Sequence, residues 1–459
     1  MQQPSHNMRT FYTLILTQVF SLIGSRISGL AIGIYVFNQT GDATPLALVS
    51  FFAILPQVIA SGVSGVLADR YDRRYVMALS DAGQAVGTVL LLFSFLSGNF
   101  QLWHLYGVAF IQAIFGVFQG PAFMSSVTML VPDSQRDRAN AIQQLSGPTA
   151  GIIAPAIAGL IYSAVGVTGA IGIDLLTFLV AVVVVLRVHI PHPEKTAEGA
   201  AFSGSVWKES LGGFRYLLAR RPLFILMLHI SLLNFLVGGS AALMTPYVLA
   251  RTGSEATLGI LLSLMNLGAI TGGVLLGVLS GKVRTRIHLI LPGVLVMGAF
   301  LVTLGMSQGA VLIGASLFLV LLPTSIINAT FMSLLQAKVA PDIQGRVFAV
   351  IGQLAMLLMP LAYLLVGPLA DNMFEPAVAQ PGWGTIAPLV GNSAGAGMGL
   401  IMVIGGVLIV LTTLVVYAIP TVRHLERNIP DYVPMTTNSP ETENMSGTPA
   451  EAAAVVYDR

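Results

Sequence analysis

The sequence predicts an all-α integral membrane protein, with twelve transmembrane helices in two pseudo-symmetric bundles of six. Of its 459 residues, 55% are hydrophobic and only 9% are charged, and the mean hydropathy is +0.82. Soluble domains carry about 25% charged residues. The apolar residues form runs of about 20 or more, long enough to cross a bilayer as helices. The basic residues fall on alternate loops, and patterns of the first half return in the second.

The apolar runs form two sets of six predicted spans. The first set covers residues 10–37, 45–68, 75–97, 103–127, 140–164 and 169–188. The second set covers residues 223–250, 258–280, 287–307, 310–334, 347–370 and 395–419. The runs are continuous rather than alternating, which excludes an outer-membrane barrel. Because the first run is too long for the apolar core of a signal peptide, we expect the mature protein to retain it.

These spans predict four regions along the chain. Residues 1–189 form an N-terminal six-helix bundle and residues 222–419 a C-terminal one. Between them, residues 190–221 form a polar cytoplasmic loop, in which 206–218 has the spacing of an amphipathic helix lying on the membrane surface. Residues 420–459 are rich in Thr, Ser, Pro and Glu without apolar periodicity, and we expect a disordered cytoplasmic tail.

The distribution of Lys and Arg predicts the orientation. The loops after odd-numbered spans contain one basic residue, Arg251, and Arg26 lies inside the first span. Every other Lys and Arg lies in or beside the loops after even-numbered spans or in the terminal segments. Since cytoplasmic loops carry the excess of Lys and Arg, we expect both termini in the cytoplasm and the protein in the cell (inner) membrane.

Two patterns repeat between the halves at nearly one offset. The motif that begins at Gly65 returns at Gly277, 212 residues later, and one that begins at Phe123 returns at Phe331, 208 residues later. The halves are therefore predicted to share one plan. Such duplication is typical of secondary transporters, whose substrate sites lie between the repeats near the middle of the membrane.

The first motif reads Gly65-x-x-x-Asp69-Arg70-x-x-Arg73-Arg74. It resembles the loop 2–3 signature G-x-x-x-D-R-x-G-R-R of the major facilitator superfamily. The resemblance covers about the whole membrane region and implies the major facilitator fold.

Three further segments resemble the branch of this superfamily that holds macrolide efflux proteins, enterobactin exporters and lysophospholipid transporters. They are residues 24–26 in the first span, 139–141 at the start of the fifth, and 207–217 before the seventh. The sequence departs from the signature at Asp72, where the family usually has Gly.

Two roles are open for the loop 2–3 motif. In the superfamily the signature Asp faces the start of span 11, so the resemblance places Asp69 near residues 345–347 as a gating latch, where the helix dipole would attract it. The arginines would then hold Asp81, Asp133 or Asp137. Alternatively, they only set the topology. The second copy has Gly in place of the acid, so we expect gating to be concentrated in the first copy.

Charged residues within predicted spans are candidates for coupling or substrate binding, because each costs at least about 2.5–3.5 kcal/mol in the membrane. Arg26 and Asp174 are predicted at similar depth in the outer half, where they could form a pair. The alternatives are a structural ion pair, or a charge in water at the outer mouth. Asp81 in the third span is expected to brace the arginines, or to act as a protonation switch.

Polar side chains in the spans are further candidates for the substrate cavity. They are Gln112, His229, Asn234, Asn266 and Asn328, together with Gln18, Gln57 and Gln119. The alternative for each is a hydrogen bond between helices. Gln112 lies in span 4, where antiporters of the superfamily usually carry Arg, which weakens the expectation of standard proton coupling.

The fifth span contains the pattern Ala150-x-x-x-Ala154-Pro155-x-x-Ala158-Gly159. It resembles the G-x-x-x-G-P-x-x-G-G motif of drug/proton antiporters, with Ala at three Gly positions. The other interpretation is close helix packing, which small residues four apart also favour.

Together these features predict a monomeric secondary transporter that exports amphipathic or hydrophobic small molecules, such as drugs, macrolides or siderophores, by rocking of its bundles. An importer or a lysophospholipid flippase of the same fold is the alternative. The chain has no Walker A motif, so the proton gradient is the expected driving force.

The same features argue against other classes of protein. A net charge of +2 gives no support for a nucleic-acid partner, and zero cysteines exclude disulfides. The His residues are scattered without H-E-x-x-H, so we expect no catalytic residue, metal or cofactor. A scaffold or sensor would need an appended domain, for which the polar tail is too short. The expected partners are the small-molecule substrate, protons and the bilayer.

The latch interpretation makes a prediction at Asp69. Topology requires positive charge but not this carboxylate. Asp69→Asn should therefore insert normally but unbalance the inward- and outward-facing states, which lowers transport at equal expression. Transport equal to that of the parent would leave the arginines as topology signals alone.

Overall fold

The computed structural model describes residues 8–70, 72–132, 135–188, 215, 217–279, 285–339, 344–429 and 431. Within these ranges every regular element is a helix, as backbone groups in a hydrocarbon layer require.

The first half contains five helices. They are α1 Met8–Thr40, α2 Thr44–Arg70, α3 Arg73–Leu96, α4 Leu102–Leu130 and α5 Arg136–Arg187. The last is two spans in one, because Gly166 breaks its helical geometry with φ 66° and ψ −171°. Only glycine adopts this conformation readily. The break lies between the predicted fifth and sixth spans.

In the described part of the second half, seven helices precede a run of short elements and one more long helix follows it. The seven are α8 Arg221–Ala242, α9 Met244–Thr252, α10 Glu255–Leu279, α11 Ile287–Met306, α12 Ala310–Lys338, α13 Gln344–Met356 and α14 Met359–Leu369. A π-turn Ala370–Phe374, α15 Glu375–Ala377, a 3₁₀ turn Pro381–Thr385 and α16 Ala387–Val390 lead into α17 Ala396–Ala418. Two short helices follow, α18 Pro420–Arg423 and α19 Leu425–Asn428.

Prolines interrupt two of the predicted spans. The seventh is divided into α8 and α9, and the eleventh into α13 and α14. Pro246 and Pro360 each lie four residues after the end of the preceding helix, at Ala242 and Met356. Because proline has no N–H to bond the carbonyl four residues earlier, each helix ends there.

The predicted spans agree with these helices, and their ends differ by only a few residues. Ten helices of the described chain are long and apolar enough to cross a membrane. The ten include α5 once, although it contains two spans. They do not include α2, because its apolar part within the described side chains, Thr44–Ala60, is shorter than the others. The all-α membrane fold is confirmed.

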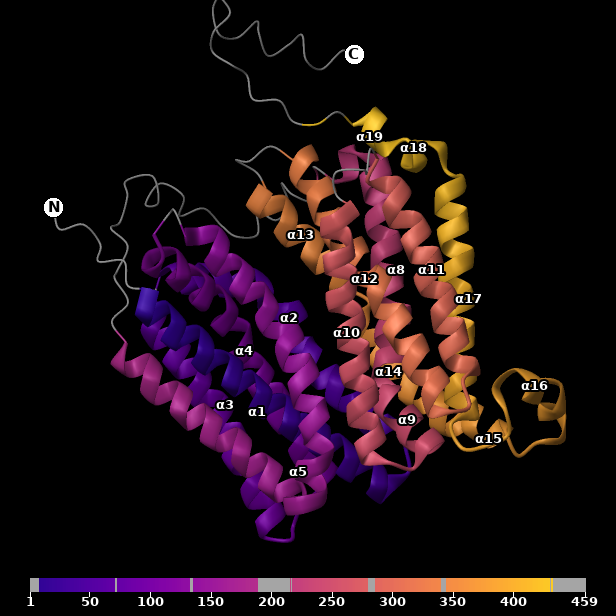
Figure 1. The fold of residues 1–459 in the computed structure, drawn as a ribbon, viewed down its shortest axis with the longest axis horizontal. Helices are drawn as coiled ribbons and strands as arrows, with labels where there is room; N and C mark the ends of the chain where they lie inside the picture. Colours follow the sequence, from indigo (N-terminus) through magenta and orange to yellow (C-terminus); the bar gives the residue numbers. More distant parts are fainter. Residues whose placement is uncertain are drawn as a thin grey trace, which may run out of the picture.

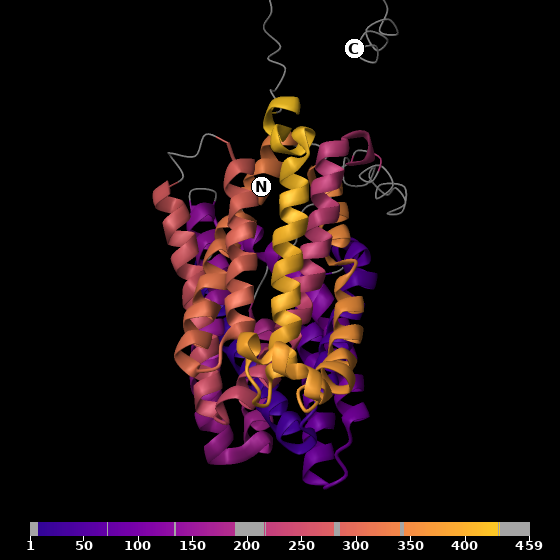
Figure 2. The same ribbon diagram turned by 90° about the vertical axis from the view of Figure 1, so that its right-hand side faces the viewer.

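The two halves form separate bundles (Figure 1). Helices α1 to α5 lie on one side and α8 to α17 on the other, and the start of α1 lies toward the same end of the molecule as α19. The bundles diverge toward that end and approach each other at the opposite one, where α5 packs on α10 and α2 on α14. Figure 2 shows the long helices of the second bundle running side by side between the two ends.

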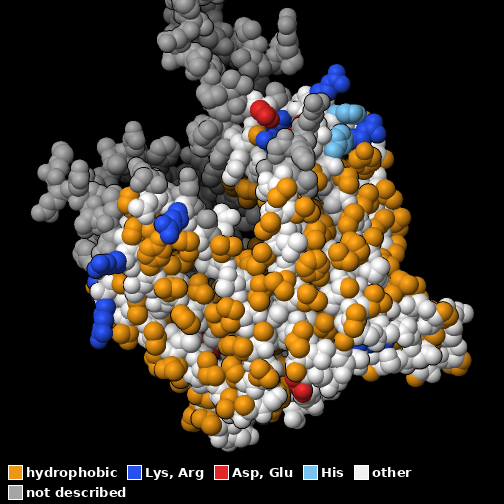
Figure 3. Space-filling model, in the orientation of Figure 1, with side chains coloured by type: hydrophobic (Ala, Val, Ile, Leu, Met, Phe, Trp, Pro, Cys, Tyr) orange, Lys and Arg blue, Asp and Glu red, His pale blue; other side chains and the backbone are white. Residues whose placement is uncertain are grey.

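The surface between the ends is apolar (Figure 3). Hydrophobic side chains cover the middle of this face, whereas Lys and Arg gather at its upper and left edges. Large side chains on the outside are strongly exposed, for example Phe93 at 70% and Val311 at 89%. A surface this apolar is suited to lipid, so the protein is a multi-pass membrane protein.

The predicted tail begins with folded structure. Val422 and Leu425 of α18 and α19 are fully buried against the second bundle, so residues 420–428 differ from the expected disorder. Lys338 Nζ at the end of α12 donates to the Glu426 carbonyl at 3.1 Å and pairs with Asp431 at 2.7 Å. Residues 432–459 and the predicted amphipathic helix at 206–218, apart from 215 and 217–218, lie outside the described residues.

Candidate functional site

A cavity of about 620 Å³ lies between the two bundles, which we call the large cavity. Its wall is mainly apolar and comes from α2, α3 and α4, while Met356 at the end of α13 closes it from the second bundle. Three glutamines, Gln57, Gln84 and Gln112, supply its polar groups. Sequence reasoning identified Gln57 and Gln112 as cavity residues but missed Gln84.

A second cavity of about 160 Å³, the side pocket, extends from the large cavity into the first bundle. The two share Val49, Gln84, Ala109 and Gln112 in their walls. Asp174 of α5 lines the side pocket and is only 4% exposed.

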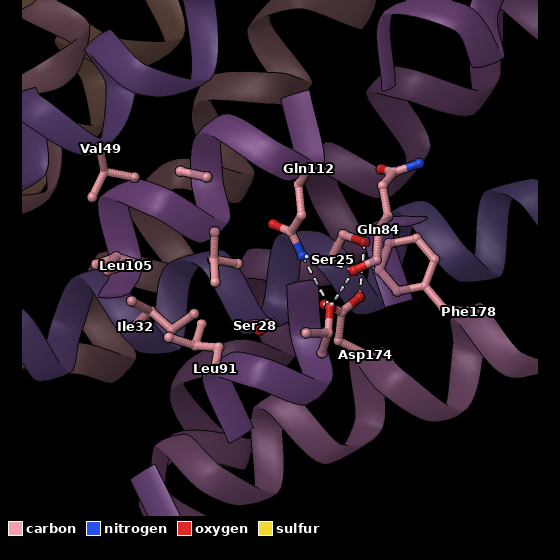
Figure 4. Close-up of a pocket in the computed structure, with 14 residues that line it drawn as sticks. Ser25, Ser28, Ile32, Val49, Gln84, Leu91, Leu105, Gln112, Asp174 and Phe178 are labelled. Atoms are coloured by element: carbon pink, nitrogen blue, oxygen red, sulfur yellow. Dashed lines mark hydrogen bonds between the residues drawn. The ribbon is translucent and has the colours of Figure 1, made fainter. Parts of the chain in front are cut away.

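Hydroxyl groups hold the Asp174 carboxylate. Ser25 Oγ donates to it at 2.8 Å and Thr88 Oγ1 at 3.3 Å. Gln112 Nε2 in turn donates to Thr88 Oγ1 at 3.0 Å. Figure 4 shows Ser25, Gln112 and Asp174 pointing toward one another from three different helices. Gln112 and Asp174, both candidates from the sequence, therefore belong to one hydrogen-bond network.

Arg26 and Asp174, which the sequence allowed to form a pair, do not contact each other. Asp174 bonds Ser25, which precedes Arg26 on α1, and successive residues of a helix point about 100° apart. The Arg26 side chain is exposed, and Arg26 Nη1 lies beside Gly151 of α5, where the Asn266 amide also lies. Arg26 therefore faces the junction of α1, α5 and α10.

A second buried carboxylate, Asp81 of α3, lies in a network of amides. Gln18 Nε2 donates to it at 3.3 Å and Gln119 Nε2 at 2.5 Å. Gln84 Nε2 donates to Gln119 Oε1 at 2.8 Å, and Gln112 Nε2 reaches the Gln84 carbonyl at 3.3 Å. The two networks thus meet at Gln84.

The expectation that Asp81 braces the loop arginines is not met in the described chain, where its carboxylate bonds Gln18 and Gln119 and no arginine. Asp81 is 0% exposed, so it does not face the large cavity directly.

The candidates of the second bundle lie apart from this system. His229 Nε2 bonds Thr413 Oγ1 of α17 at 3.1 Å, and Asn234 Nδ2 donates to the Ala355 carbonyl at 3.0 Å. Asn266 Nδ2 donates to the Leu262 carbonyl of its own helix, and Asn328 is exposed on α12. His229 and Asn234 thus make the interhelical contacts that were the alternative to substrate binding.

A carboxylate from the second bundle caps a helix of the first at the end where the bundles approach each other. Asp371 Oδ1 accepts a hydrogen bond from Ala43 N at 2.8 Å, and Asp371 Oδ2 accepts one from Thr44 N at 2.6 Å. These amides are unsatisfied donors at the positive end of α2. Asn38 Nδ2 donates to Glu255 Oε1 nearby at 3.1 Å. Both contacts hold the bundles together at this end.

The small residues of the fifth span lie where α5 meets α1 and α10. Ala154 and Ala158 are fully buried against α1. A Cβ on Gly159 would meet the Glu255 backbone of α10 at 2.8 Å, and one on Gly259 of α10 would strike the Pro155 carbonyl. The fully buried Ala150 completes the motif. This geometry gives the motif a packing role between bundles.

The loop 2–3 motif is described only in part, because the side chains of Gly65, Asp69 and Arg70 lie outside the described residues. Asp72 has φ −59° and ψ 116°, and its Oδ1 accepts from Arg74 N at 2.9 Å as the N-cap of α3. This conformation does not require glycine, and Asp is a favoured N-cap. The departure from the family signature is therefore explained. The latch stays a prediction.

Sequence reasoning missed Asp371, Glu255, Ser25 and Thr88. Asp371 lies in the π-turn after α14 and Glu255 begins α10, and acidic residues are ordinary at such helix ends. Ser and Thr are common in spans. One signal in the sequence could have identified the two acids. Only 9% of the residues are charged, so an acid beside a span is uncommon here and is expected to have a specific partner.

Comparison with known proteins agrees with the helical membrane fold described above. The profile of the Major Facilitator Superfamily matches residues 14–363. Macrolide efflux protein A of Streptococcus pyogenes is 30% identical over 370 residues, which is 79% of this chain and 90% of that protein. Enterobactin exporter EntS of Escherichia coli O1:K1 / APEC is 26% identical over 295 residues, which is 63% of this chain and 68% of that protein.

Solved structures share the fold. A bacterial homologue of the human lysosomal transporter Spinster, crystallised in an inward-facing and unoccupied conformation, superposes with a TM-score of 0.73 at 16% identity. The match covers 94% of this chain and 100% of that one. A mutant of the nucleoside transporter NupG gives 0.68 at 13% identity, with 90% and 100% covered.

The cap on α2 predicts the effect of Asp371→Ala. Loss of an N-cap costs about 0.5–2 kcal/mol, so the bundles should separate at this end roughly two- to thirtyfold more often. The chain has zero cysteines, so Ala47→Cys, at a fully buried position of this contact, can report the opening by its thiol labelling rate. Asp371→Ala should accelerate labelling. An unchanged rate would show that the cap does not hold the bundles together.

The same contact predicts a pH dependence through Asp42. Partial burial, and then the neighbouring Asp371 carboxylate, raise the pKa of Asp42. Separation of the bundles returns this pKa toward its ordinary value of about 3.9. At a pH between the ordinary and the raised pKa, Asp42 binds a proton more readily in the closed state than in the open one. Lowering the pH through this window therefore stabilises the contact between the bundles. Labelling of Ala47→Cys, corrected for free cysteine at each pH, should slow as pH falls through this window. Asp42→Asn should remove the dependence, and its persistence would exclude Asp42.

Proposed function

The chain belongs to the major facilitator superfamily, and from this premise we propose that it exports amphipathic or hydrophobic small molecules by alternating access, driven by the proton gradient. It is a transporter and not an enzyme. The observation that carries the proposal is the large cavity between the bundles, whose far end is closed by contacts between the bundles. Because those contacts join the bundles at one end, we expect the cavity to load from the other end.

The character of the cavity wall supports an amphipathic substrate. Seven of its ten residues are Val, Ala, Gly or Met, and the other three are glutamines. Apolar surface with a few polar groups is the usual composition of a small-molecule site. The size of about 620 Å³ is that of a site for a drug-sized molecule.

Two observations support export. The relatives reported above are named for efflux of macrolides and export of enterobactin. The distribution of Lys and Arg favours cytoplasmic termini by the positive-inside rule, and with that orientation the end opposite the Asp371 contact faces the side from which an exporter loads. The protein would work as a monomer in the cell membrane.

The buried acids support coupling to protons. Asp81 and Asp174 accept hydrogen bonds from neutral donors, and no cation pairs with them among the described residues. An ionised carboxylate in such surroundings is costly unless a proton or another cation neutralises it. Protonation of one acid can therefore accompany a change in the packing of α1, α3 and α4.

Accumulation of fluorescent dyes and antibiotics in cells that lack other exporters tests the proposal. The intact protein should lower accumulation, and an uncoupler should restore it. An accumulation higher than in cells without the protein would instead indicate import. Lysophospholipid movement without drug export would indicate a flippase.

Two glycines of α10 provide matched controls for this assay. Leu at Gly259 would collide with the Pro155 carbonyl and prevent closure of α5 on α10, whereas the space around Gly273 is open. Gly259→Leu should abolish export and Gly273→Leu should retain it at equal expression. Equal activity of the two variants would contradict the rocking mechanism.

A further inference from the structure

The side pocket places an acid where a cation is missing. Asp174 is 4% exposed and accepts only from the hydroxyls of Ser25 and Thr88, and no Lys, Arg or His pairs with it among the described residues. A buried ionised carboxylate requires a compensating charge. The neighbouring Arg26 does not supply it, because its side chain lies at the contact of α5 and α10.

The space beside Asp174 has the size of a small alkylamine. A cavity of 150 Å³ in another protein holds benzene, and the side pocket measures about 160 Å³. Beside Asp174, two glutamines and three hydroxyl side chains, the lining is mainly aliphatic or aromatic and includes Ile32, Leu91, Leu105, Val108 and Phe178. Such walls suit methyl or methylene groups around a charged nitrogen, and an aromatic face also attracts a cation.

The pocket is not isolated. It shares Gln84 and Gln112 with the large cavity, so a molecule can occupy both spaces at once. We infer that the side pocket binds the protonated amine head of an amphipathic cation against Asp174, while the apolar body of that molecule fills the large cavity. The inference rests on the proposed function only in taking this cation to be a transported substrate.

Cysteine labelling tests the pocket directly. The chain has zero cysteines, and Ser28, which lines the pocket and is 4% exposed, can be changed to Cys with little change in size. Full-length Ser28→Cys protein in lipid nanodiscs is treated with cationic 2-aminoethyl methanethiosulfonate or neutral methyl methanethiosulfonate. The ratio of the two rates is divided by the same ratio for free cysteine.

A carboxylate at close range should raise this normalised ratio at least about tenfold, because charges a few ångströms apart interact strongly at the effective dielectric of a protein. Asp174→Asn in the same background should return the ratio to about one, since the amide keeps the shape and loses the charge. Asp81→Asn is the matched control, a buried acid of the same bundle that lines neither cavity. It should leave the ratio unchanged.

Protection by an amphipathic ligand then tests whether the pocket recognises a positively charged head. Dodecyltrimethylammonium should slow labelling by the neutral reagent, whereas dodecyl maltoside, with the same chain and an uncharged head, should not. Asp174→Asn should abolish the protection.

Two results would overturn the inference. One is a ratio that Asp174→Asn leaves unchanged. The other is a labelling rate that responds to exchange of sodium for potassium and not to the alkylammonium, which would indicate an inorganic cation site.

The labelling needs no gradient and no turnover, so it separates this inference from the proposed function. A preference for the cationic reagent in a protein that fails the accumulation assay would refute export alone. Intact export of neutral compounds without that preference would refute the pocket alone.

Discussion

The cost of polar groups in hydrocarbon governs this structure. Every backbone amide of a span must be satisfied within its own helix, so the described chain contains helices and no strands. Helices break where the residue type allows or requires it. Gly166 supplies a left-handed residue between two spans, and Pro246 and Pro360 each end a helix four residues earlier. The same cost applies to side chains, and it explains why few acids lie in the spans and why each one has partners.

Those partners are divided unequally between two bundles of similar plan. In the first bundle, two carboxylates and four glutamines form linked networks that reach the large cavity at Gln84 and Gln112. In the second, His229 and Asn234 bond neighbouring helices. Among the described residues, the buried carboxylates of the spans thus lie in the first bundle, whereas the second contributes Met356 to the cavity and carboxylates to the closed end.

The closed end depends on helix termini as well as on packing. Asp371 of the second bundle accepts hydrogen bonds from the first amides of α2 in the first bundle. The N-cap of this helix, which a neighbouring residue of the same helix usually supplies, thus comes from the other bundle. Separation of the bundles exposes those amides to water and removes the cap. The close approach of α5 and α10 at Gly159 and Gly259 adds a contact that only small residues allow.

The sequence by itself determined the helical membrane class, the spans, the repeat and the family, because hydropathy, charge placement and turn residues act locally along the chain. It also identified Asp81, Asp174 and Gln112 as unusual, since polar groups in a span need a reason. Only the tertiary structure decided their partners. Ser25 rather than Arg26 faces Asp174, and Asp371 reaches a helix more than 300 residues away in the chain. Which side of a helix faces which neighbour depends on rotation and packing, and a one-residue difference turns a side chain by about 100°.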